Sequence, residues 1–481
     1  MIPAPTRRYA DSILAFIAAL LLGLSFPPIG AWYLSPVAML CLFWALDPGH
    51  EKKGLWWRVG IPFALTVQLW VWFWLRTVTV YVGPAYAQVA WLGAALIQSF
   101  FWVLAFFVYT RWPLKYPWRF FYFALVFVMG DVLRAQGPWA ATYGAPWLPL
   151  IDFSFFALNA RYLGYWGFGL LYMNLCGAGY ALLRALYERR YVPVIFGFNA
   201  FLAVIFCLCL YGRLVFPTLL IIPPDHPLQH KRVALLQGNF AQSLKLSANS
   251  FQAMQDFYLS ATRALPRDVD VALWPETVIP AFMLDRPSFV YGLRSALEGR
   301  ETEVVLGLPL RGPGESYFNG AVLFSNEGPV ASYTKSRLVP FGEYIPLRSV
   351  LRKLIGDQAY MQTDYAVGTV RYPLQTRAGK AGILICFEST LPQLARQRKH
   401  DGADWLAVLT NDAWFLDSPA AAMHLQISRW RAVEQGLPLF FAANTGISAV
   451  VDPAGRVLQS LALGKQGQIV YYFERAYRPV M

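Results

Sequence analysis

Residues 381–388 read Ala-Gly-Ile-Leu-Ile-Cys-Phe-Glu, an apolar run that ends on Cys386 and is followed by Glu388. Glycines on one side and a Ser-to-Pro turn on the other indicate a short buried strand that carries Cys386 at its C-terminal tip. Ligands of α/β sheets bind at the carboxyl ends of the strands. A lone cysteine is more often a buried core residue, so the interpretation of Cys386 as a reactive thiol depends on the rest of the chain.

The chain divides by composition into an apolar part and a more polar part. Of its 481 residues, 57% are hydrophobic and 14% are charged, which indicates residence in a membrane. Residues 1–212 hold six of the 28 acidic residues. We therefore predict a transmembrane region at 1–212, a linker at 213–230 and an aqueous domain at 231–481. The basic residues form no long cluster, so the net charge of +13 does not indicate nucleic-acid binding.

Apolar segments in the first region predict about seven membrane-crossing helices packed as a bundle. They lie at 12–26, 32–46, 59–75, 89–110, 120–135, 162–183 and 193–212. A signal peptide at the start is set aside because further apolar segments follow it. The loops on one side carry Arg7, Arg8, Lys52, Lys53, Arg58, Arg111, Lys115, Arg119, Arg184, Arg189 and Arg190. The positive-inside rule makes that side, and the N-terminus, cytoplasmic, and it places the C-terminal domain outside the cytoplasm.

Cysteine usage agrees with this orientation. Cys41, Cys176, Cys207 and Cys209 lie in predicted spans, where they are expected to pack against neighbouring helices. Cys386 is then the one cysteine of the outer domain. An unpaired cysteine in an oxidising compartment is a candidate reactive thiol.

From about Lys231 the pattern becomes that of a soluble α/β domain. Predicted strands lie at 233–237, 269–274, 304–309, 320–324, 382–386, 405–410, 439–443, 448–451 and 468–473. Predicted helices lie at 249–265, 287–299, 390–400 and 419–435. This alternation favours helices packed on a mixed sheet.

Three other ionisable residues follow strands or lie in turns of this domain: Glu276, Lys335 and Glu343. A thiol becomes a good nucleophile only when it is deprotonated, so a carboxylate base and a neighbouring ammonium would suit acyl transfer. For any one of these charges alone, a solvated turn or a surface ion pair is the more common explanation. Convergence of the four side chains in space is a hypothesis at this stage.

Ordered motifs give these residues a family resemblance. The stretches are 236–239 (LQGN), 274–280 (WPETVIP), Lys335 with 338–346 (LVPFGEYIP), 386–388 (CFE), 410–415 (TNDAWF), 443–448 (ANTGIS) and, in the apolar half, 137–147. Together they resemble the nitrilase, or carbon-nitrogen hydrolase, superfamily fused to a polytopic membrane region, as in the apolipoprotein N-acyltransferase family. The fold implied is a membrane α-helical bundle plus an α/β nitrilase-like αββα sandwich.

The resemblance implies a Glu-Lys-Cys triad. Glu276 would be the general base, Cys386 the nucleophile, and Lys335 with the backbone amide of Phe387 the stabiliser of the oxyanion. Glu343 and Glu388 would position the lysine and support the intermediates.

The resemblance also implies substrates and a location. An acyl chain would pass from a phospholipid, usually phosphatidylethanolamine, through a thioester to the α-amino group of the diacylglyceryl-cysteine of a bacterial apolipoprotein. No cofactor and no metal is required, and a monomer suffices. The location implied is the bacterial inner membrane, with the catalytic domain on the periplasmic side. A bilayer-tethered enzyme would reach both lipids without desorbing an acyl chain, which costs about 0.8 kcal/mol per CH₂.

Several features depart from the family pattern or remain open. Lys245 is followed by Leu246 where the family has tryptophan, and residues 416–423 lack a glycine-proline pair. Most members carry a further span after the outer domain, whereas this sequence stops at Met481. The segment 347–355 alternates apolar and basic residues as an interfacial lid or an ordinary surface helix would.

Three alternatives stand beside the acyltransferase. A membrane-anchored amidase would use the same triad on a lipid-like amide, with water in place of the amine. A cysteine protease would pair Cys386 with His400 or His424. The third is a non-enzymatic carrier or scaffold. A carrier would use charges inside the membrane, of which Asp131 is the clearest candidate, although a local pair with Arg134 is the simpler interpretation.

Overall fold

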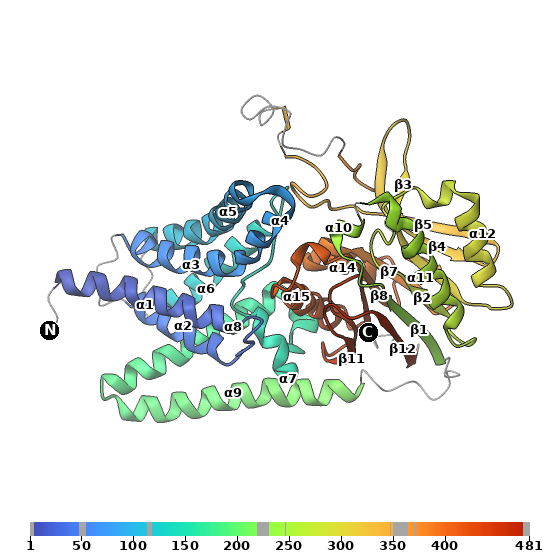
Figure 1. The fold of residues 1–481 in the computed structure, drawn as a ribbon. Helices are drawn as coiled ribbons and strands as arrows, with labels where there is room; N and C mark the ends of the chain where they lie inside the picture. Colours follow the sequence, from blue (N-terminus) through green and yellow to red (C-terminus); the bar gives the residue numbers. More distant parts are fainter. Residues whose placement is uncertain are drawn as a thin grey trace. The chain divides into compact units, whose positions relative to one another are not determined.

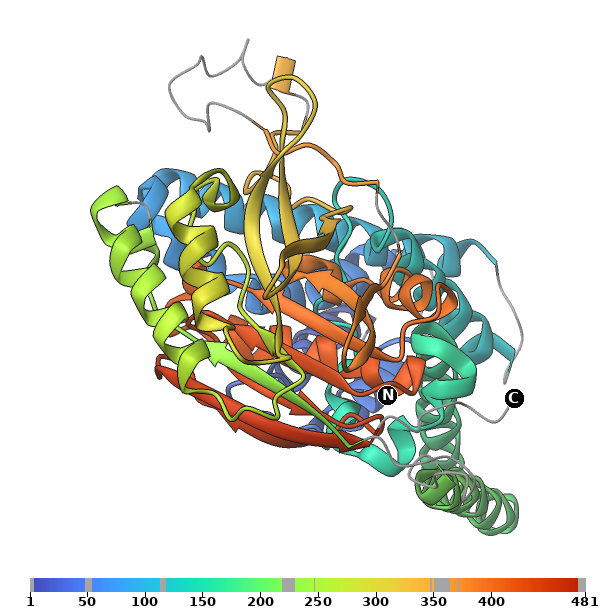
Figure 2. The same cartoon turned by 90° about the vertical axis from the view of Figure 1, so that its right-hand side faces the viewer.

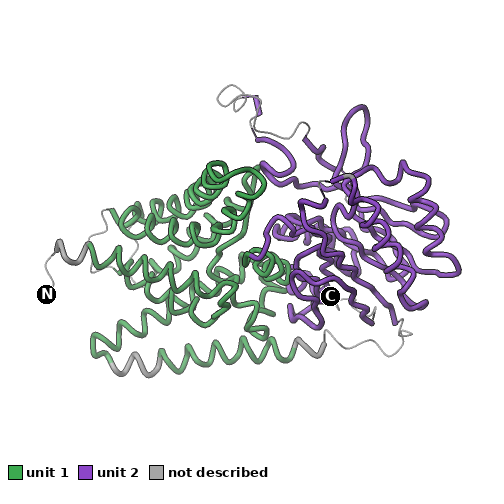
Figure 3. The backbone as a smooth tube through the Cα atoms, in the orientation of Figure 1, with its two compact units in different colours: residues 1–218, 418–430 green, residues 219–417, 431–481 purple. Residues whose placement is uncertain are grey.

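The computed structural model describes residues 4–47, 54–112, 118–218, 230–245, 247–346, 348–349, 364–369 and 372–474. The chain forms two compact units, one of residues 1–218 with 418–430 and the other of residues 219–417 with 431–481 (Figure 3). Of the predicted segment 347–355 only residues 348 and 349 are described. Residues 219–229 of the predicted linker, Leu246 and the C-terminal residues 475–481 also lie outside the described residues.

The first unit is built of helices at each of the seven apolar segments (Figure 1). They are α1 (Ala4–Leu24), α2 (Leu34–Ala45), η1 (Trp56–Gly60), α3 (Ile61–Val71), η2 (Phe73–Val78), α4 (Thr79–Val82), α5 (Pro84–Arg111), α6 (Trp118–Arg134), η3 (Leu148–Asp152), α7 (Ser154–Ala157), α8 (Ala160–Tyr187) and α9 (Tyr191–Thr218). Among the described residues, Pro84–Arg111 and Gly197–Leu214 are each long and apolar enough to cross a membrane. Trp56–Val71 with Phe73–Val82, bent by 46°, passes the same test as a pair. The count of seven crossings stays a prediction.

A buried polar cluster holds the loop after α6. Asp131 and Arg134 are fully buried and form an ion pair of 2.5 Å between Arg134 Nη2 and Asp131 Oδ1. The indole of Trp166 donates to Asp131 Oδ2 at 3.2 Å, and Arg134 Nη1 donates to the carbonyl oxygen of Tyr143 at 2.5 Å. Because a buried charge is tolerated when it is paired and hydrogen-bonded, this cluster has a structural explanation, and the local-pair interpretation of Asp131 is the one the contacts favour.

The loop 137–147 is packed inside the same unit. Trp147 is completely buried, and a Cβ on Gly169 of α8 would lie 2.7 Å from its ring. Ser35 Oγ donates to the carbonyl oxygen of Pro146 at 2.5 Å. Trp147 is therefore a core residue of the helical unit and not a member of an interfacial aromatic belt, whereas Tyr33 is 60% exposed.

The second unit is a sandwich of two six-stranded sheets (Figures 1 and 2). The first sheet has the order β12-β1-β2-β3-β4-β5 and the second the order β11-β10-β9-β8-β7-β6. The strands of the first are β1 (His230–Gln237), β2 (Val271–Leu273), β3 (Glu303–Arg311), β4 (Tyr317–Ser325), β5 (Gly328–Thr334) and β12 (Gly467–Glu474). Those of the second are β6 (Leu374–Thr376), β7 (Gly379–Ile385), β8 (Trp405–Thr410), β9 (Leu439–Ala443), β10 (Ser448–Val451) and β11 (Val457–Leu461). The remaining elements are α10 (Gln242–Lys245), η4 (Ala248–Ser250), α11 (Phe251–Ala264), η5 (Met283–Asp285), α12 (Pro287–Ala296), η6 (Cys386–Thr390), α14 (Pro392–His400) and η7 (Ala413–Phe415). α15 (Ala420–Gln435) is divided, since its residues up to Trp430 belong to the first unit.

Alternation along the strands explains the layers. Val233 and Leu235 of β1 join the core between the two sheets, while Ala234 and Leu236 join the core that α11 and α12 cover. Successive side chains of a strand point to opposite faces, so a strand that is apolar at every position must be covered on both sides. The expected αββα sandwich is confirmed.

Three strands were not predicted from the sequence: β5, β6 and β11. β5 lies at an edge of the first sheet and is mostly exposed. Thr376 pairs with Gly379 in the tight hairpin of β6 and β7, and residues 457–461 of β11 are mostly exposed. An apolar run is the feature by which a strand is recognised. Neither β6 nor β11 has one, because each lies at an edge of the second sheet.

Candidate active site

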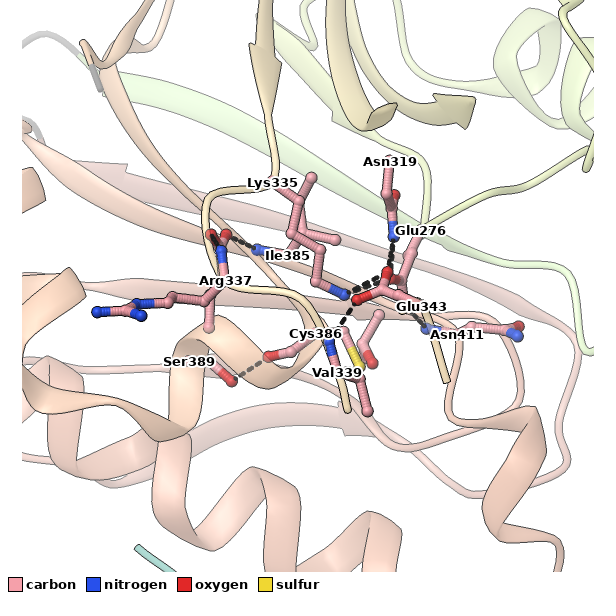
Figure 4. Close-up of polar contacts among 12 residues, drawn as sticks. Glu276, Asn319, Lys335, Arg337, Val339, Glu343, Ile385, Cys386, Ser389 and Asn411 are labelled. Atoms are coloured by element: carbon pink, nitrogen blue, oxygen red, sulfur yellow. Dashed lines mark hydrogen bonds and ion pairs between the residues drawn. The ribbon is translucent and has the colours of Figure 1, made fainter. Parts of the chain in front are cut away.

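Strand directions bring the predicted site residues to one edge of the sandwich. β1, β2 and β3 run parallel to one another, and β5 follows antiparallel β4, so β5 runs in the direction of β3. In the second sheet β7, β8 and β9 are parallel. Glu276 follows β2, Lys335 follows β5, and Cys386 follows β7. Figure 4 shows the side chains of these residues, with that of Glu343, turned toward one another.

A glycine allows Glu276 to approach the neighbouring strand. A Cβ on Gly307 of β3 would lie 2.4 Å from the carbonyl oxygen of Pro275 and 2.6 Å from the Cα of Glu276. The backbone hydrogen bond from Gly307 N to Pro275 O, at 3.2 Å, confirms the close contact. Such contact between backbones is possible only without a side chain.

Lys335 forms the centre of the charged group. Its side chain is 1% exposed, and its Nζ lies 3.1 Å from Glu276 Oε1 and 2.9 Å from Glu343 Oε1. Burial alone would lower the pKa of Lys335, but the charges of the two glutamates outweigh burial and hold this pKa well above its usual value. Lys335 therefore carries a positive charge at neutral pH.

The two glutamates at this lysine differ in their ionisation. Burial would raise the pKa of Glu276, but the charge of Lys335 and the hydrogen bond from Asn319 bring it below its usual value. For Glu343 burial dominates over the charge of Lys335, and its pKa is raised. Two like charges at one cation cannot ionise equally, so Glu276 is the better candidate for an ionised base.

Hydrogen bonds fix both carboxylates. Asn319 Nδ2 donates to Glu276 Oε1 at 2.7 Å and to Glu343 Oε1 at 2.6 Å. The backbone amide of Asn411 donates to Glu276 Oε2 at 3.1 Å, and that of Val339 donates to Glu343 Oε2 at 2.8 Å. Each carboxylate is thus held at both oxygens.

Cys386 is the first residue of η6, at the sharp turn that directly follows β7. Its φ of +50° is in the left-handed region, which costs a non-glycine residue about 1–3 kcal/mol and often marks a functional site. The predicted position at the tip of the strand is confirmed, since β7 ends at Ile385. Burial, with the charge of Glu276, raises the pKa of the thiol, and the ammonium of Lys335 opposes that rise. The resting thiol is therefore protonated and needs a base.

Glu388 connects two strand ends, and the donors that bind its carboxylate are groups of Tyr333, Ser336, Arg337 and Ile385. Its Oε2 accepts the backbone amide of Ile385 at 2.9 Å, and its Oε1 accepts the backbone amide of Ser336 at 2.7 Å. The hydroxyl of Tyr333 also donates to Oε1, at 2.8 Å. Glu388 is completely buried. It thus sets the distance between the chain after β5, which carries Lys335, and the turn that carries Cys386.

Three residues of the site had no motif that would have assigned them a role: Asn319, Asn411 and Lys245. Asn319 lies near the start of β4, at the edge where β3 and β5 end, because β4 is antiparallel to both. Asn411 belongs to the quoted stretch 410–415, but its contact with Glu276 depends on strand order. Lys245 was noted only for the residue that follows it. The contacts of all three residues with the site depend on which distant segments of the chain become neighbours in the fold.

The geometry gives little support to a histidine partner for the thiol from α14. His400 is the last residue of that helix, with 84% of its side chain exposed and an ion-pair distance of 3.6 Å to Asp401. Cys386 lies just before the other end of the same helix. Nine helical residues span about 13 Å. His424 belongs to the segment 418–430 of the first unit and is buried there.

Within the described residues, no group of three or more His, Cys, Asp or Glu side chains is arranged to hold a metal ion. What the site does provide is a partly exposed thiol beside a buried ionised carboxylate and a buried charged ammonium. This set can form a covalent acyl intermediate and stabilise its oxyanion.

Comparison with known proteins finds similarity in both halves of the chain. The family model described as carbon-nitrogen hydrolase matches residues 232–476, and the one described as apolipoprotein N-acyltransferase N-terminal domain matches residues 18–178. An apolipoprotein N-acyltransferase of Azotobacter vinelandii is 29% identical over 94% of this chain and 87% of its own length. One of Brucella melitensis is 30% identical over 89% and 78%. A nitrilase-superfamily structure from Saccharomyces cerevisiae is 19% identical, covers 51% of this chain and 90% of its own, and has a TM-score of 0.39.

Proposed function

Because the chain belongs to the apolipoprotein N-acyltransferase family, we propose that it moves an acyl chain from a phospholipid to the N-terminal diacylglyceryl-cysteine of bacterial lipoproteins. The observation that carries this proposal is the buried contact of Lys335 with both Glu276 and Glu343 beside the thiol of Cys386, in a chain whose other half matches the N-terminal domain of that family. An acyltransferase needs a nucleophile that holds the acyl group between two substrates, and a cysteine thiol can do this.

In the first half-reaction the Glu276 carboxylate takes the thiol proton as the sulfur attacks the ester carbonyl of the phospholipid. The oxyanion that forms is stabilised by the ammonium of Lys335 and the backbone amide of Phe387. When the intermediate collapses, the carbon–oxygen bond breaks and Glu276 returns the proton to the departing lysophospholipid oxygen. The acyl chain remains as a thioester on Cys386.

In the second half-reaction the neutral α-amine of the acceptor attacks the thioester. Glu276 accepts a proton from the amine, the same two donors stabilise the second oxyanion, and the thiolate leaves and is reprotonated. Glu343 keeps Lys335 in place, and Glu388 holds the two strand ends at a fixed separation. All six predicted site residues thus have a role in the proposed cycle.

The finer assignments belong to the same proposal. Phosphatidylethanolamine is the proposed donor, and the enzyme acts as a monomer in the bacterial inner membrane with its catalytic unit on the periplasmic side. Loops rich in arginine and lysine on the other side support that orientation. The lipid character of both substrates suits a chain that has apolar helices long enough to cross a bilayer.

The amidase alternative has less support. It would require the same thiol, lysine and glutamate, so the site alone does not separate it from an acyltransferase. The apolar half does separate them, because residues 18–178 match the N-terminal domain model of the acyltransferase family. We therefore expect an amine, and not water, to discharge the thioester.

The test is mass spectrometry of the purified full chain incubated with phosphatidylethanolamine. We expect an acyl adduct on the peptide that contains Cys386, and we expect its transfer to a diacylglyceryl-cysteine peptide added afterwards. Discharge by water with no gain from the peptide would favour the amidase. No adduct on Cys386, with folded protein, would contradict the proposal.

A further inference from the structure

A second buried lysine lies behind the general base. Lys245, the last residue of α10, is 2% exposed. Its Nζ donates to the side-chain oxygen Oδ1 of Asn411 at 2.9 Å and lies 3.4 Å from the carbonyl oxygen of Glu276. Burying an ammonium without a contacting carboxylate is costly, so a structural reason alone gives no account of a lysine at this position.

The contacts of Lys245 lead to the functional end of Glu276. The backbone amide of Asn411 donates to Glu276 Oε2, and Lys245 holds the side chain of the same asparagine. Asn411 is held further by Gln242 at 2.7 Å and by Asn444 at 2.9 Å. Lys245 therefore reaches Glu276 in two ways. It lies near the carbonyl oxygen of Glu276, and it holds Asn411, whose backbone amide binds Glu276 Oε2.

We propose that Lys245 is a positioning residue for the general base, which orients Glu276 through Asn411 and uses its positive charge to keep the carboxylate ionised. This inference rests on the proposed function, in which Glu276 removes the thiol proton. Lys245 does not touch the reacting atoms. It acts on the chemistry through the carboxylate that does.

Electrostatics distinguish Lys245 from the lysine of the triad. Lys335 contacts two carboxylates and keeps a raised pKa, whereas burial lowers the pKa of Lys245 to about 7 and the more distant charge of Glu276 opposes this only in part. Beyond Glu276 lie Lys335 and Glu343, and Cys386, Asp412 and Tyr365 are further titratable groups that interact with them among the described residues. Below about pH 7 Lys245 is charged and favours an ionised Glu276, and above that pH its charge is lost.

Three variants of the full chain separate charge from hydrogen bonding. Lys245→Gln keeps an N–H donor for Asn411 but has no charge, and Lys245→Met loses both. Lys465→Met is the matched control, because Lys465 is exposed in the same unit and its side chain plays no part in the site. Thermal midpoints of all three variants report whether the fold is retained.

The probe is a short-chain p-nitrophenyl ester, which acylates the thiol without a phospholipid. The Cys386 sulfur forms the thioester, p-nitrophenolate leaves, and the thiol proton passes to Glu276. The rate of adduct formation on the Cys386 peptide is measured by mass spectrometry at pH 5.5 and pH 8.5. A wild-type chain that reacts with the ester but not with phosphatidylethanolamine would count against the proposed function, while the ratios among the lysine variants would still test the role of Lys245.

We expect Lys245→Met to acylate at least about tenfold more slowly than wild type at both pH values, since a buried network loses a member. The acylation rate of Lys245→Gln should be about tenfold lower than that of wild type at pH 5.5 and close to it at pH 8.5, where Lys245 of the wild type is largely neutral. The inference would be overturned if the ratio of the acylation rate of wild type to that of Lys245→Gln were equal at the two pH values. It would also be overturned if Lys245→Met acylated as fast as Lys465→Met. If Lys245→Met does not fold, the Lys245→Gln ratio decides.

Discussion

At the scale of single residues, the site depends on one cation shared by two carboxylates. Lys335 Nζ is within 3.1 Å of one oxygen of each glutamate, and the resulting pKa shifts are opposite in direction for Glu276 and Glu343. Asn319 donates to both carboxylates and favours the ionised form of each, so the opposite shifts arise elsewhere: burial dominates at Glu343, and the charge of Lys335 with the hydrogen bonds dominates at Glu276. The chemistry therefore depends on Glu276, Lys335 and Cys386, which follow the ends of β2, β5 and β7.

Glu276→Gln should separate acylation from thiol reactivity. The lowered pKa of Glu276 means that the wild-type carboxylate is ionised at neutral pH, so it can take the thiol proton there. The amide cannot do this or return a proton to the leaving oxygen. We expect the rate of acyl transfer from phospholipid to fall by about 10²–10⁴-fold, as measured by adduct formation on Cys386.

The control is alkylation of Cys386 by iodoacetamide, which has no leaving group that needs a proton from Glu276. Glu276→Gln also removes a negative charge that raises the pKa of the thiol, and Lys335 remains to stabilise a thiolate, so this variant should alkylate within about tenfold of wild type. Equal loss in both reactions would contradict the second task of Glu276, the return of a proton to the leaving oxygen, because the whole effect would then lie in the reactivity of the thiol.

Lys335→Met tests the shared cation. Without it Glu276 and Glu343 face each other through Asn319 alone, so the two carboxylates should share a proton and the pKa of Glu276 should rise. Glu276 would then become protonated at a higher pH in Lys335→Met than in the wild type. We expect at least about a 10³-fold loss of adduct formation, because the oxyanion donor is lost as well. Partial recovery at pH 9 would fit the titration, and retained activity at pH 7 would refute the assignment of Lys335.

At the scale of elements, the separation of strand ends decides whether these side chains meet. Glu388 accepts hydrogen bonds from the ends of β5 and β7, and replacing it by glutamine puts an amide donor where three backbone amides and the hydroxyls of Tyr333 and Ser336 also donate. A buried donor without an acceptor costs about 1–3 kcal/mol. We expect Glu388→Gln to lower the free energy of unfolding by about that amount and to slow acylation, both measured on purified protein. Slow acylation by a variant of wild-type stability would instead indicate a direct role.

Gly307 of β3 sets the approach of Glu276 to the next strand. Gly307→Ala places a methyl 2.4 Å from the carbonyl oxygen of Pro275, and backbone atoms cannot move aside as a side chain can. We expect a loss of about 1–3 kcal/mol in stability and at least about tenfold in acylation rate, because the base is displaced. The thermal midpoint and the rate of adduct formation measure the two effects.

Gly292→Ala in α12 is the matched control for that substitution. A Cβ there meets only the terminal Cδ1 of Leu259, at 3.0 Å, and alanine is favoured over glycine in a helix by about 1 kcal/mol. It should leave acylation unchanged and stability equal or slightly higher. A Gly307→Ala variant that behaves like Gly292→Ala would show that the close contact at β3 is not needed.

The sequence predicted most of the elements and the three central residues, and the limits of that prediction are physical. β7 was predictable because five apolar residues precede Cys386, and the inner and outer faces of β1 follow from a run that is apolar at every position. Asn319 and Lys245 were not assignable, because their contacts with Glu276 and Asn411 span 43 and 166 residues of sequence. No local pattern records which strands become neighbours.

At the scale of the whole molecule, composition and compact structure divide the chain differently. The hydrophobic fraction changes once, near residue 212, yet residues 418–430 cluster with residues 1–218 (Figure 3). In that unit the completely buried indole of Trp430 donates to the carbonyl oxygen of Leu148 at 3.0 Å, and its ring lies 4.9 Å from that of Phe168. The helical unit therefore uses a piece of chain from far along the sequence to fill its core.

Trp430→Ala should consequently destabilise the helical unit first. Removing a buried aromatic side chain costs about 3–5 kcal/mol, and here it also leaves the carbonyl of Leu148 without this donor. Hydrogen exchange read by mass spectrometry should show faster exchange in peptides of α8, which carries Phe168, than in peptides of β7 and β8. Arg429→Ala is the control, since its ion pair with Asp152 is partly exposed, at 2.6 Å with side chains 14% and 33% exposed, and such pairs contribute at most about 1 kcal/mol. Faster exchange confined to β7, β8 and β9 in Trp430→Ala, or an equal effect of Arg429→Ala, would mean that residues 418–430 are not part of the helical core.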